Sequence, residues 1–317
     1  MVRLRTAELE LGLVSDGLEM RTPAFCSSCC GQSSGRRSPL NGLETNLIVT
    51  ISVQGLSGVE EIQGDIYDYP KYYDLVYGSD WKAEFDFLLA CADRFLDPPL
   101  ESAFEPACGT GRLLYRLGKS GFQVAGNDLN PKAVQFCNQR LARFGLPETA
   151  TVADMADFHL TQPVDLGFNM INSFRHLSTE ALAAAHLQCM ARAIRSGGIY
   201  VLGLHLVPSR GEACESEAWS ATRGHLTVNS DLWLVDRKLE ERYEEYAMQY
   251  DIYTPSRQFR IRDQLRFRTY TADQFCQLVD RTDGLKIEAI FDFQYDLSEP
   301  APLDEDTEDA IFILRAG

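Results

Sequence analysis

The sequence E-P-A-C-G-T-G-R, from Glu105 to Arg112, decides the fold of this chain. It follows a short apolar run, and Asp128 lies seventeen residues past Gly111. Glycines at a strand-to-helix turn let backbone amides approach a ligand closely, and a carboxylate at the end of the next strand can hold both hydroxyls of a ribose. The pairing predicts a site for a nucleoside-containing cofactor.

The residues around the glycines indicate which cofactor this is. A dinucleotide fingerprint reads G-x-G-x-x-G and needs its third small residue for close packing of helix and strand, but this chain has Leu114 there. Glu105 would repel a pyrophosphate, whereas it can lie near the positive groups of S-adenosylmethionine. The pattern therefore favours S-adenosylmethionine over NAD. A generic doubly wound domain with incidental glycines is the alternative.

Two further motifs follow in order, G-N-D-L-N at residues 126–130 and A-D-M-A-D-F at residues 153–158. With the glycine loop they resemble the class I S-adenosylmethionine-dependent methyltransferases, over roughly residues 65 to 317. The resemblance implies an α/β fold with a doubly wound, seven-stranded, Rossmann-like sheet, and S-adenosylmethionine as the cofactor.

Alternating strands and helices predict the same architecture. The first helix follows the glycine loop, and the second begins with Asn130 as cap and Pro131 in its first turn. Such alternation implies a parallel, right-handed, doubly wound sheet. We expect strands at residues 102–105, 123–127, 149–152, 164–171 and 199–205, and helices at residues 112–120 and 179–195, the latter ended by Gly197 and Gly198.

After the fifth strand the period changes. Segments at residues 226–235, 239–253 and 257–268 combine aromatic and aliphatic residues with alternating charges, which is typical of antiparallel strands with a solvated face. We predict an antiparallel β insertion over residues 206–269, inside a methyltransferase domain of residues 61–317. In the resembled family such an insertion caps the substrate pocket or joins subunits. A helix at 272–281 and an antiparallel pair of strands at 286–293 and 310–315 complete the main sheet.

Residues 1–60 are rich in Ser, Gly and Thr and show no sustained helical or strand period. We predict a disordered extension, with an edge strand at 47–53 as the minority alternative. Nothing near Cys26, Cys29 and Cys30 supplies the second pair of ligands that a zinc site needs, so we predict no metal site.

Composition limits where and on what the protein acts. No apolar stretch approaches the about 20 residues that span a bilayer, and acidic residues interrupt residues 1–20, so we expect no membrane insertion and no secretory signal. Nine cysteines, scattered through predicted core elements, suit a reducing compartment, so we expect a cytoplasmic protein. A net charge of −16 opposes binding to nucleic acid.

The resemblance implies roles for named residues around the cofactor. Asp128 would hold the ribose and Leu129 would pack beside the adenine. Asp154 would accept from the adenine amino group, with Met155 beside the ring, and a helix cap or loop residue is the minority alternative for Asp154. The methionine part and the remaining cofactor contacts are assigned to Tyr67, Tyr73, Glu105, Cys108, Gly109, Gly111, Arg112 and Asn172.

The segment after the fourth strand, residues 169–177, lies where open α/β sheets place their ligands. It resembles the corresponding segment of small-molecule methyltransferases, but it lacks the two prolines found in enzymes that methylate nucleobases or glutamine. His176 could accept a proton from a substrate amine or hydroxyl, because its ordinary pKa lies near neutrality. A capping or orienting role for His176 is the alternative.

Aromatic residues crowd the region before the first strand, and the run Tyr73-Asp74-Leu75 is similar to the N-terminal lid of sugar and glycine-type N-methyltransferases. An aromatic ring attracts a positive centre such as a sulfonium. We therefore take Tyr73 with His176 as the catalytic candidates, against the alternative of an aromatic core stripe. The aromatic residues of this region are Tyr67, Tyr72, Tyr73, Tyr77 and Trp81.

Five arginines lie within twelve residues, and several glutamates precede them. They could bind an anionic substrate, but we favour a solvated face of ion pairs across the insertion. The arginines are Arg257, Arg260, Arg262, Arg266 and Arg268, and the glutamates are Glu240, Glu241, Glu244 and Glu245.

These features predict methyl transfer from S-adenosylmethionine to a small molecule, with an amine preferred over a hydroxyl on the resemblance alone. Methylation of a protein side chain and S-adenosylmethionine binding without catalysis stay open, because function is decided by the site and not by the fold. A homodimer formed through the β insertion is a further expectation. An NAD-dependent dehydrogenase is disfavoured by Leu114.

Overall fold

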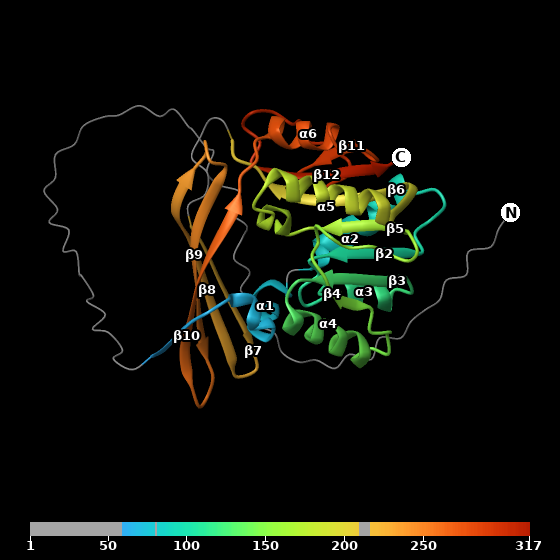
Figure 1. Ribbon diagram of the computed structural model, residues 1–317. Helices are drawn as coiled ribbons and strands as arrows, with labels where there is room; N and C mark the ends of the chain where they lie inside the picture. The colour runs from blue at the N-terminus through green and yellow to red at the C-terminus, as the bar shows by residue number, and fades with distance from the viewer. Residues whose placement is uncertain (1–58, 80, 209–215) are drawn as a thin grey trace, which may run out of the picture. The chain divides into compact units, whose positions relative to one another are not determined.

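The structure is a computed structural model that describes residues 59–79, 81–208 and 216–317. Residues 1–58 of the predicted extension, with its alternative strand at 47–53 and the cysteines at 26–30, therefore lie outside the described residues. The prediction of disorder up to residue 60 was wrong at its end, because Glu60 begins strand β1 (Glu60–Gln63). The described part of the chain contains one seven-stranded sheet flanked by helices and a second sheet of five strands (Figure 1).

The seven-stranded sheet has the order β11-β12-β6-β5-β2-β3-β4. The five strands from β6 to β4 in this order pair in parallel, and β12 pairs antiparallel with both β6 and β11. This confirms the doubly wound sheet and the antiparallel pair at its end. The strands are β2 (Ser102–Pro106), β3 (Gln123–Asp128), β4 (Ala150–Val152), β5 (Val164–Asn169), β6 (Ile194–His205), β11 (Leu285–Phe291) and β12 (Asp309–Ala316).

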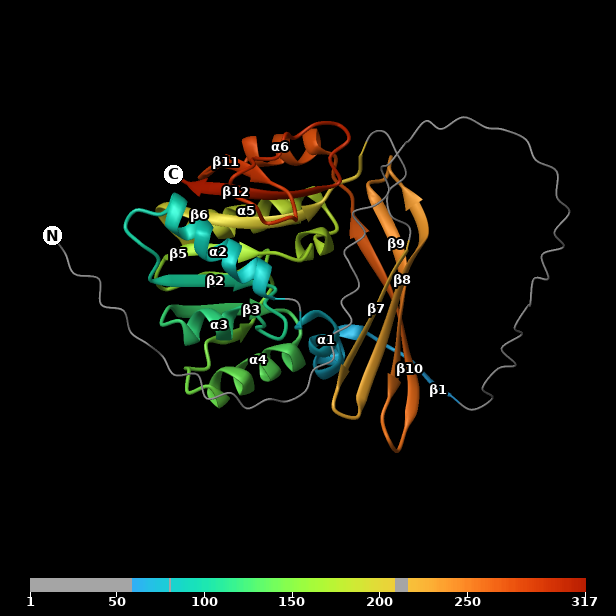
Figure 2. The same ribbon diagram turned by 180° about the vertical axis from the view of Figure 1, so that it is seen from behind.

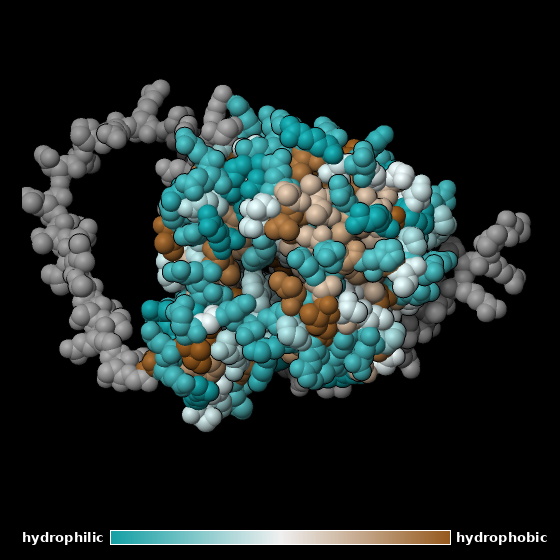
Figure 3. All heavy atoms as spheres, viewed as in Figure 1, coloured by the Kyte–Doolittle hydropathy of each residue, from teal (hydrophilic) through white to brown (hydrophobic). Residues whose placement is uncertain are grey.

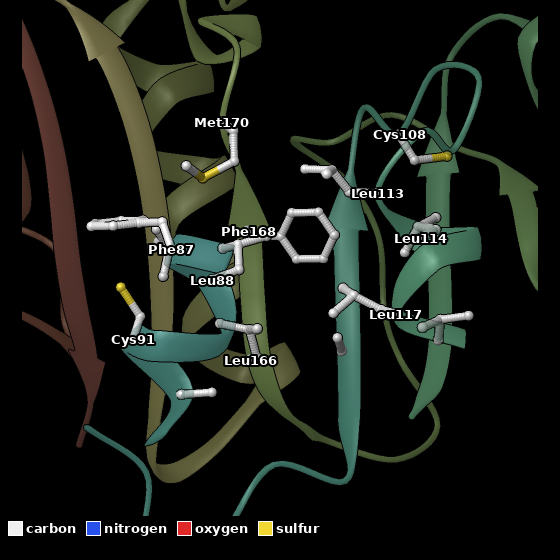
Figure 4. Close-up of a cluster of buried hydrophobic side chains, with 14 of the residues drawn as sticks. Phe87, Leu88, Cys91, Cys108, Leu113, Leu114, Leu117, Leu166, Phe168 and Met170 are labelled. Atoms are coloured by element: carbon white, nitrogen blue, oxygen red, sulfur yellow. The ribbon is translucent and has the colours of Figure 1, made fainter. Parts of the chain in front are cut away.

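Helices cover both faces of this sheet (Figures 1 and 2). Alternate residues of the buried strands point to opposite faces, so Phe168 packs with α2, α3 and α4, and Tyr200 packs with α5 and α6. Figure 4 shows Phe87 and Leu88 of α2 beside Leu166 and Phe168 in the first of these cores. The helices are α2 (Lys82–Phe95), α3 (Leu114–Lys119), α4 (Pro131–Arg143), α5 (Glu180–Ala193) and α6 (Ala272–Asp280).

Local sequence explains where α4 begins. It also explains why the predicted boundary between α5 and β6 was wrong. Asn130 caps α4 by accepting from the amides of Lys132 and Ala133, with Pro131 in the first turn, as predicted. The helix predicted to reach residue 195 ends at Ala193, and strand β6 begins at Ile194, five residues early. Gly197 has a φ of 77° and lies where the β5–β6 register shifts. The glycine pair thus forms a bulge inside the strand rather than a helix end.

The antiparallel insertion forms most of the second sheet, in the order β1-β10-β9-β8-β7. Two strands were not among the predicted segments: β7, which turns into β8 at Gly224 with φ 61°, and β1, which pairs in parallel with β10. Both are edge strands with few buried residues, so the apolar signal of a central strand is missing. The strands are β1 (Glu60–Gln63), β7 (Ser216–Arg223), β8 (Leu226–Lys238), β9 (Tyr243–Tyr253) and β10 (Gln258–Arg268).

One face of the second sheet packs on the segment before the first Rossmann strand. That segment consists of the 3-10 helix η1 (Ile66–Asp68) and helix α1 (Pro70–Tyr77), and its residues Ile66, Leu75 and Val76 share a core with Tyr250 and Ile261 of the sheet. The amide of Ile66 donates to Asp263 Oδ2 at 2.8 Å. These contacts fix the aromatic segment between the sheet of the insertion and the glycine loop.

The arginines of β10 and of the turn before it form ion pairs along the second sheet, and only some of their partners are the predicted ones. Arg260 meets Asp251 at 2.6 Å and Arg257 meets Glu60 at 2.7 Å. Of the predicted glutamates, Glu245 lies 3.9 Å from Arg266, and Glu244 is buried elsewhere. The prediction of ion pairs across the insertion is confirmed for Arg266 and Glu245, whereas the other acidic partners come from β1, from Asp251 of β9 and from Glu180 of α5.

No helix in residues 59–79, 81–208 and 216–317 is long and apolar enough to cross a membrane. On the face shown in Figure 3, hydrophobic side chains lie in small groups among hydrophilic ones.

Candidate functional site

The glycine loop after β2 contains three residues in the left-handed region, Ala107, Gly109 and Gly111, with φ of 51°, 52° and 65°. A Cβ at Gly109 would have no atom within 4 Å, whereas a Cβ at Gly111 would lie 2.3 Å from Cys137 Sγ. Gly111 is therefore required by packing, and Gly109 leaves open space over the loop. Such space is what a ligand needs to approach the backbone.

Asp128 at the end of β3 is tied to this loop. Its carboxylate accepts from the amide of Gly109 at 2.8 Å and from the amide of Asn130 at 2.8 Å. Burial raises the pKa of Asp128, and these two amides oppose the rise. Because the side chain is only half-buried, it remains able to hold hydroxyl groups of a ligand placed over Gly109.

Glu105 is the buried carboxyl at the end of β2, and its Oε2 has no hydrogen-bond partner in the described part of the chain. Burial raises its pKa well above the ordinary value, although Arg112 opposes this. A buried carboxyl without a partner is unfavourable unless a donor or a positive group completes it. The ammonium of the methionine part of S-adenosylmethionine would do so, and this orphaned oxygen is the feature that fits the cofactor best.

Two other predicted cofactor residues direct their side chains elsewhere. The Cys108 thiol lies in the core beside Cys137, where that neighbour and burial raise its pKa (Figure 4). Arg112 forms a buried ion pair with Glu84 of α2. Cys108 can therefore serve a ligand through its backbone, and Arg112 joins the loop to α2.

Sequence reasoning missed the contacts that dock α1 on the loop. The Asp74 carboxylate is buried, accepts from Thr110 Oγ1 at 3.0 Å and pairs with Arg140 at 2.5 Å. Arg140 also donates to the carbonyl of Thr110 at 3.0 Å. The only signal for this network was the position of Asp74 in the aromatic run, since its partners are distant in sequence.

The predicted aromatic stripe divides into separate contacts. Tyr73 lies between Tyr67 and Tyr77, with ring centroids at 5.5 and 4.7 Å. Burial raises the pKa of Tyr73 to about 12. The charge of Arg112 opposes this rise, and the charges of Asp128 and Glu105 add to it. By contrast, Tyr72 packs on Phe259, and Trp81 packs on Phe85 and under Arg116.

Tyr67 meets His176 across this region. The Tyr67 hydroxyl and His176 Nε2 lie 2.9 Å apart, and the His176 ring also contacts Phe267 of β10. His176 ends the 3-10 helix η2 (Ser173–His176), which follows β5. The residue is exposed, but desolvation by the surrounding protein and then the charge of Arg175 lower the pKa of His176 to about 4. His176 is therefore neutral near pH 7.

Four further predicted residues lie around the same edge of the sheet. Leu129 is 71% exposed, and Asp154 Oδ1 accepts from the amide of Ala156 at 2.8 Å, which is the loop role considered above. Met155 is half-buried, and its carbonyl lies 2.9 Å from Nδ1 of His186. Asn172 has a φ of 53° and accepts from the amide of His205 at 3.1 Å, so its side chain joins η2 to β6.

A buried ion pair that sequence reasoning missed anchors η2 to the second sheet. Arg175 pairs with Glu244, and Arg237 pairs with the same carboxylate at 2.7 Å. Arg175 also donates from Nε to the carbonyl of Arg268 at 2.9 Å. The site is thus built by elements of both sheets. Among the described residues, no group of three or more His, Cys, Asp or Glu side chains is arranged to hold a metal ion.

Comparison with known proteins shows which proteins this chain is similar to. Residues 103–198 match the family model described as a methyltransferase domain, and no curated protein matches the chain. The chain is similar to the sugar N-methyltransferase KedS8 from Streptoalloteichus sp ATCC 53650, at 17% identity and a TM-score of 0.62, over 90% of this chain and 99% of that one. It is also similar to DesVI of Streptomyces venezuelae, at 18% identity and a TM-score of 0.65, over 81% and 100% of the two chains. CalS10, an amino pentose methyltransferase from Micromonospora echinaspora solved with S-adenosylmethionine, gives 17% identity and a TM-score of 0.59, over 78% and 96%.

The solved structures confirm the class I methyltransferase fold. The family match shows that residues 103–198 resemble a methyltransferase domain in sequence, and S-adenosylmethionine is the ligand bound in the solved neighbour CalS10.

Proposed function

We propose that this enzyme methylates an amine of a small molecule held beside Tyr67 and His176. The observation that supports this most is the 2.9 Å contact between the Tyr67 hydroxyl and His176 Nε2, at the carboxyl end of the parallel strands. The ring centroid of Tyr73 lies 5.5 Å from that of Tyr67, and the next residue, Asp74, accepts a hydrogen bond from Thr110 of the glycine loop, so the pair and the glycine loop belong to one region.

The cofactor supplies an electrophilic methyl group when bound, and Glu105, Gly109 and Asp128 are the residues we expect to hold it. The lone pair of the amine forms the new nitrogen–carbon bond as the sulfur–carbon bond breaks. Alignment and exclusion of water are the main demands of such a displacement. The Tyr67 ring lies against those of Tyr73 and His176, which supports an enclosed, oriented acceptor.

The lowered pKa of His176 sharpens its proposed role. A group with a pKa of about 4 is a weak base near pH 7, so it is poorly suited to retain a proton from an ammonium. Neutral His176 and the Tyr67 hydroxyl can instead hydrogen-bond an uncharged amine and direct its lone pair. The proton released after transfer then passes to solvent.

The preference for an amine of a small molecule has support from the neighbours, which include a sugar N-methyltransferase and an amino pentose methyltransferase. Their low identity leaves the acceptor of this chain a proposal. The test of this proposal must separate it from two alternatives, methylation of a protein side chain and cofactor binding without catalysis.

The test is mass spectrometry of acceptors incubated with S-adenosylmethionine and the full chain. Glucosamine and glucose form a matched pair, because they differ in one amine. We expect methylation of an amine-bearing acceptor and none of its hydroxyl counterpart. Cofactor binding with no transfer to any amine would support the non-catalytic alternative, and transfer only to protein would support the other.

Variants separate the roles of His176. If His176 orients the amine through one neutral hydrogen bond, His176→Ala lowers turnover by about tenfold or less and leaves cofactor affinity unchanged. Loss of a proton-abstracting base would cost about 100-fold or more. His159→Ala is the matched control, since His159 is exposed and lies in the loop before β5. Equal turnover of both variants would leave His176 a purely structural residue.

Dimerisation and location are also proposals. We propose that the antiparallel insertion joins two copies through the second sheet, whose exposed side chains include Trp233, Val235 and Tyr253. Light scattering of the purified protein tests this, and a monomer would refute it. The described cysteines are all free thiols, which supports a cytoplasmic location, to be tested by cell fractionation.

A further inference from the structure

A hollow of about 250 Å³ lies where β9 and β10 meet the start of α5. It is separate from the glycine loop and from the contact between Tyr67 and His176. Arginine is its commonest lining residue. The lining residues are Ser178, Thr179, Glu241, Arg242, Tyr243, Arg266 and Arg268.

The arginines here outnumber the carboxylates that pair with them. Glu180 alone meets three guanidinium groups, those of Arg242 at 2.7 Å, Arg268 at 3.4 Å and Arg281 at 3.7 Å. Arg266 has its nearest carboxylate, Glu245, at 3.9 Å and lies over the ring of Tyr243. Glu241 also lines the hollow, so three carboxylates, Glu180, Glu241 and Glu245, face four arginines, and one positive charge remains without a partner.

Two observations show that these arginines are not fully satisfied by the protein. Nε of Arg268 is buried and has no hydrogen-bond partner in the described part of the chain. The pKa of Arg242 is lowered by burial and then by the charge of Arg268. A buried guanidinium nitrogen without an acceptor is unfavourable, and an added anion would relieve both conditions.

We propose that this hollow binds an anion of the phosphate type. The planar guanidinium groups match phosphate oxygens in geometry, and Arg266, with 58% of its side chain exposed, can turn to meet a ligand. The hydroxyls of Ser178 and Thr179 line the same wall, where the positive end of the α5 dipole lies. Although the chain carries a net charge of −16, a Debye length of about 8 Å lets the local arginines dominate.

The hollow lies next to the proposed methyl-transfer site. Phe267, between Arg266 and Arg268 in β10, contacts the His176 ring with centroids 4.8 Å apart. Ser178 and Thr179 follow His176 in the chain. The anion can therefore be a group carried by the acceptor, or a separate small ion whose binding changes the position of His176 through Phe267. Phosphate chemistry is common to both sources.

Calorimetric titration of the full chain with inorganic pyrophosphate, at constant ionic strength, tests the site itself. We expect saturable binding that is weakened at least tenfold by Arg266→Gln, which removes one charged donor and no close ion pair. Arg262→Gln is the matched control: it lies in the same strand, loses the same charge, pairs with Glu61 and does not line the hollow. The Arg262→Gln variant should bind pyrophosphate with the same affinity as the unaltered chain.

No saturable binding at millimolar pyrophosphate would overturn the proposal. Equal weakening in Arg266→Gln and Arg262→Gln would also overturn it, because the effect would then be one of general charge. Circular dichroism of both variants confirms that each is folded. Since pyrophosphate binding is measured without methyl transfer, this test can fail or succeed independently of the proposed function.

A second arm distinguishes the two sources. Glucosamine 6-phosphate and glucosamine are compared as acceptors in the unaltered chain and in Arg266→Gln. A lower KM for the phosphorylated sugar that is lost in Arg266→Gln assigns the hollow to the acceptor. If Arg266→Gln weakens pyrophosphate binding but leaves the KM values of both sugars unchanged, the hollow is assigned to a separate anion.

Discussion

Gly109 and Gly111 share a left-handed backbone but should respond in opposite ways to an added methyl group. In Gly109→Ala the new Cβ meets nothing within 4 Å, so the stability cost is the left-handed strain alone, about 1 kcal/mol. In Gly111→Ala the Cβ would lie 2.3 Å from Cys137 Sγ, which is fully buried and has no room to move. Overpacking adds about 1–3 kcal/mol, for a total of about 2–4 kcal/mol.

Urea denaturation measures these costs, and Cys137→Ala supplies the decisive background. With the sulfur removed, the nearest atoms to the new Cβ are ordinary contacts at 3.5 Å or beyond, so Gly111→Ala should then cost only about 1 kcal/mol. The double-mutant cycle should therefore show coupling of about 1–3 kcal/mol. Additive effects would refute the packing explanation. Cofactor affinity should show the opposite order. It should fall more in Gly109→Ala than in Gly111→Ala, because the methyl group at residue 109 enters the open space over the loop.

Three further predictions concern other parts of the chain. Asp128→Ala should weaken S-adenosylmethionine binding by about 1.5–3 kcal/mol, the range for hydrogen bonds to a charged group, and unchanged affinity by calorimetry would remove Asp128 from the site. Burial lowers the pKa of His186 to about 4 in the folded state. The contribution of neutral His186 to the free energy of unfolding is therefore complete above the unfolded pKa of about 6.5, and about 3 kcal/mol of it is lost as the pH falls to 4. His186→Gln should flatten that acid limb of the denaturation curve, and an identical pH dependence would contradict this assignment. A chain starting at Ser57 should keep its melting temperature, whereas a fall of many degrees would show that residues 1–56 stabilise the domain.

The parts of the fold that sequence predicted are those with local signals. The glycine loop, the Asn130 cap and the alternating strands each carry their chemistry within a few residues, and the seven-stranded sheet follows from them. Gly197 shows the limit of such signals: glycine ends helices and also forms bulges, and only the pairing of β5 with β6 decides between them.

The candidate site was predictable as a list but not as an arrangement. Asp74, Thr110 and Arg140 form one network although they are far apart in sequence, and nothing local to Asp74 names its partners. Likewise, Glu244 was expected on a solvated face but is buried against Arg175. Such contacts depend on how the insertion packs on the Rossmann sheet, which hydrophobic periodicity does not encode.

Titration of the full chain with S-adenosylmethionine, S-adenosylhomocysteine and NADH, followed by calorimetry, tests the central claim most directly. The structure predicts one site that binds both adenosyl ligands, loses affinity in Asp128→Ala and gives no heat with NADH. Binding of NADH, or no binding of either adenosyl ligand, would contradict the claim that the loop from Glu105 to Arg112 holds the cofactor of a methyltransferase.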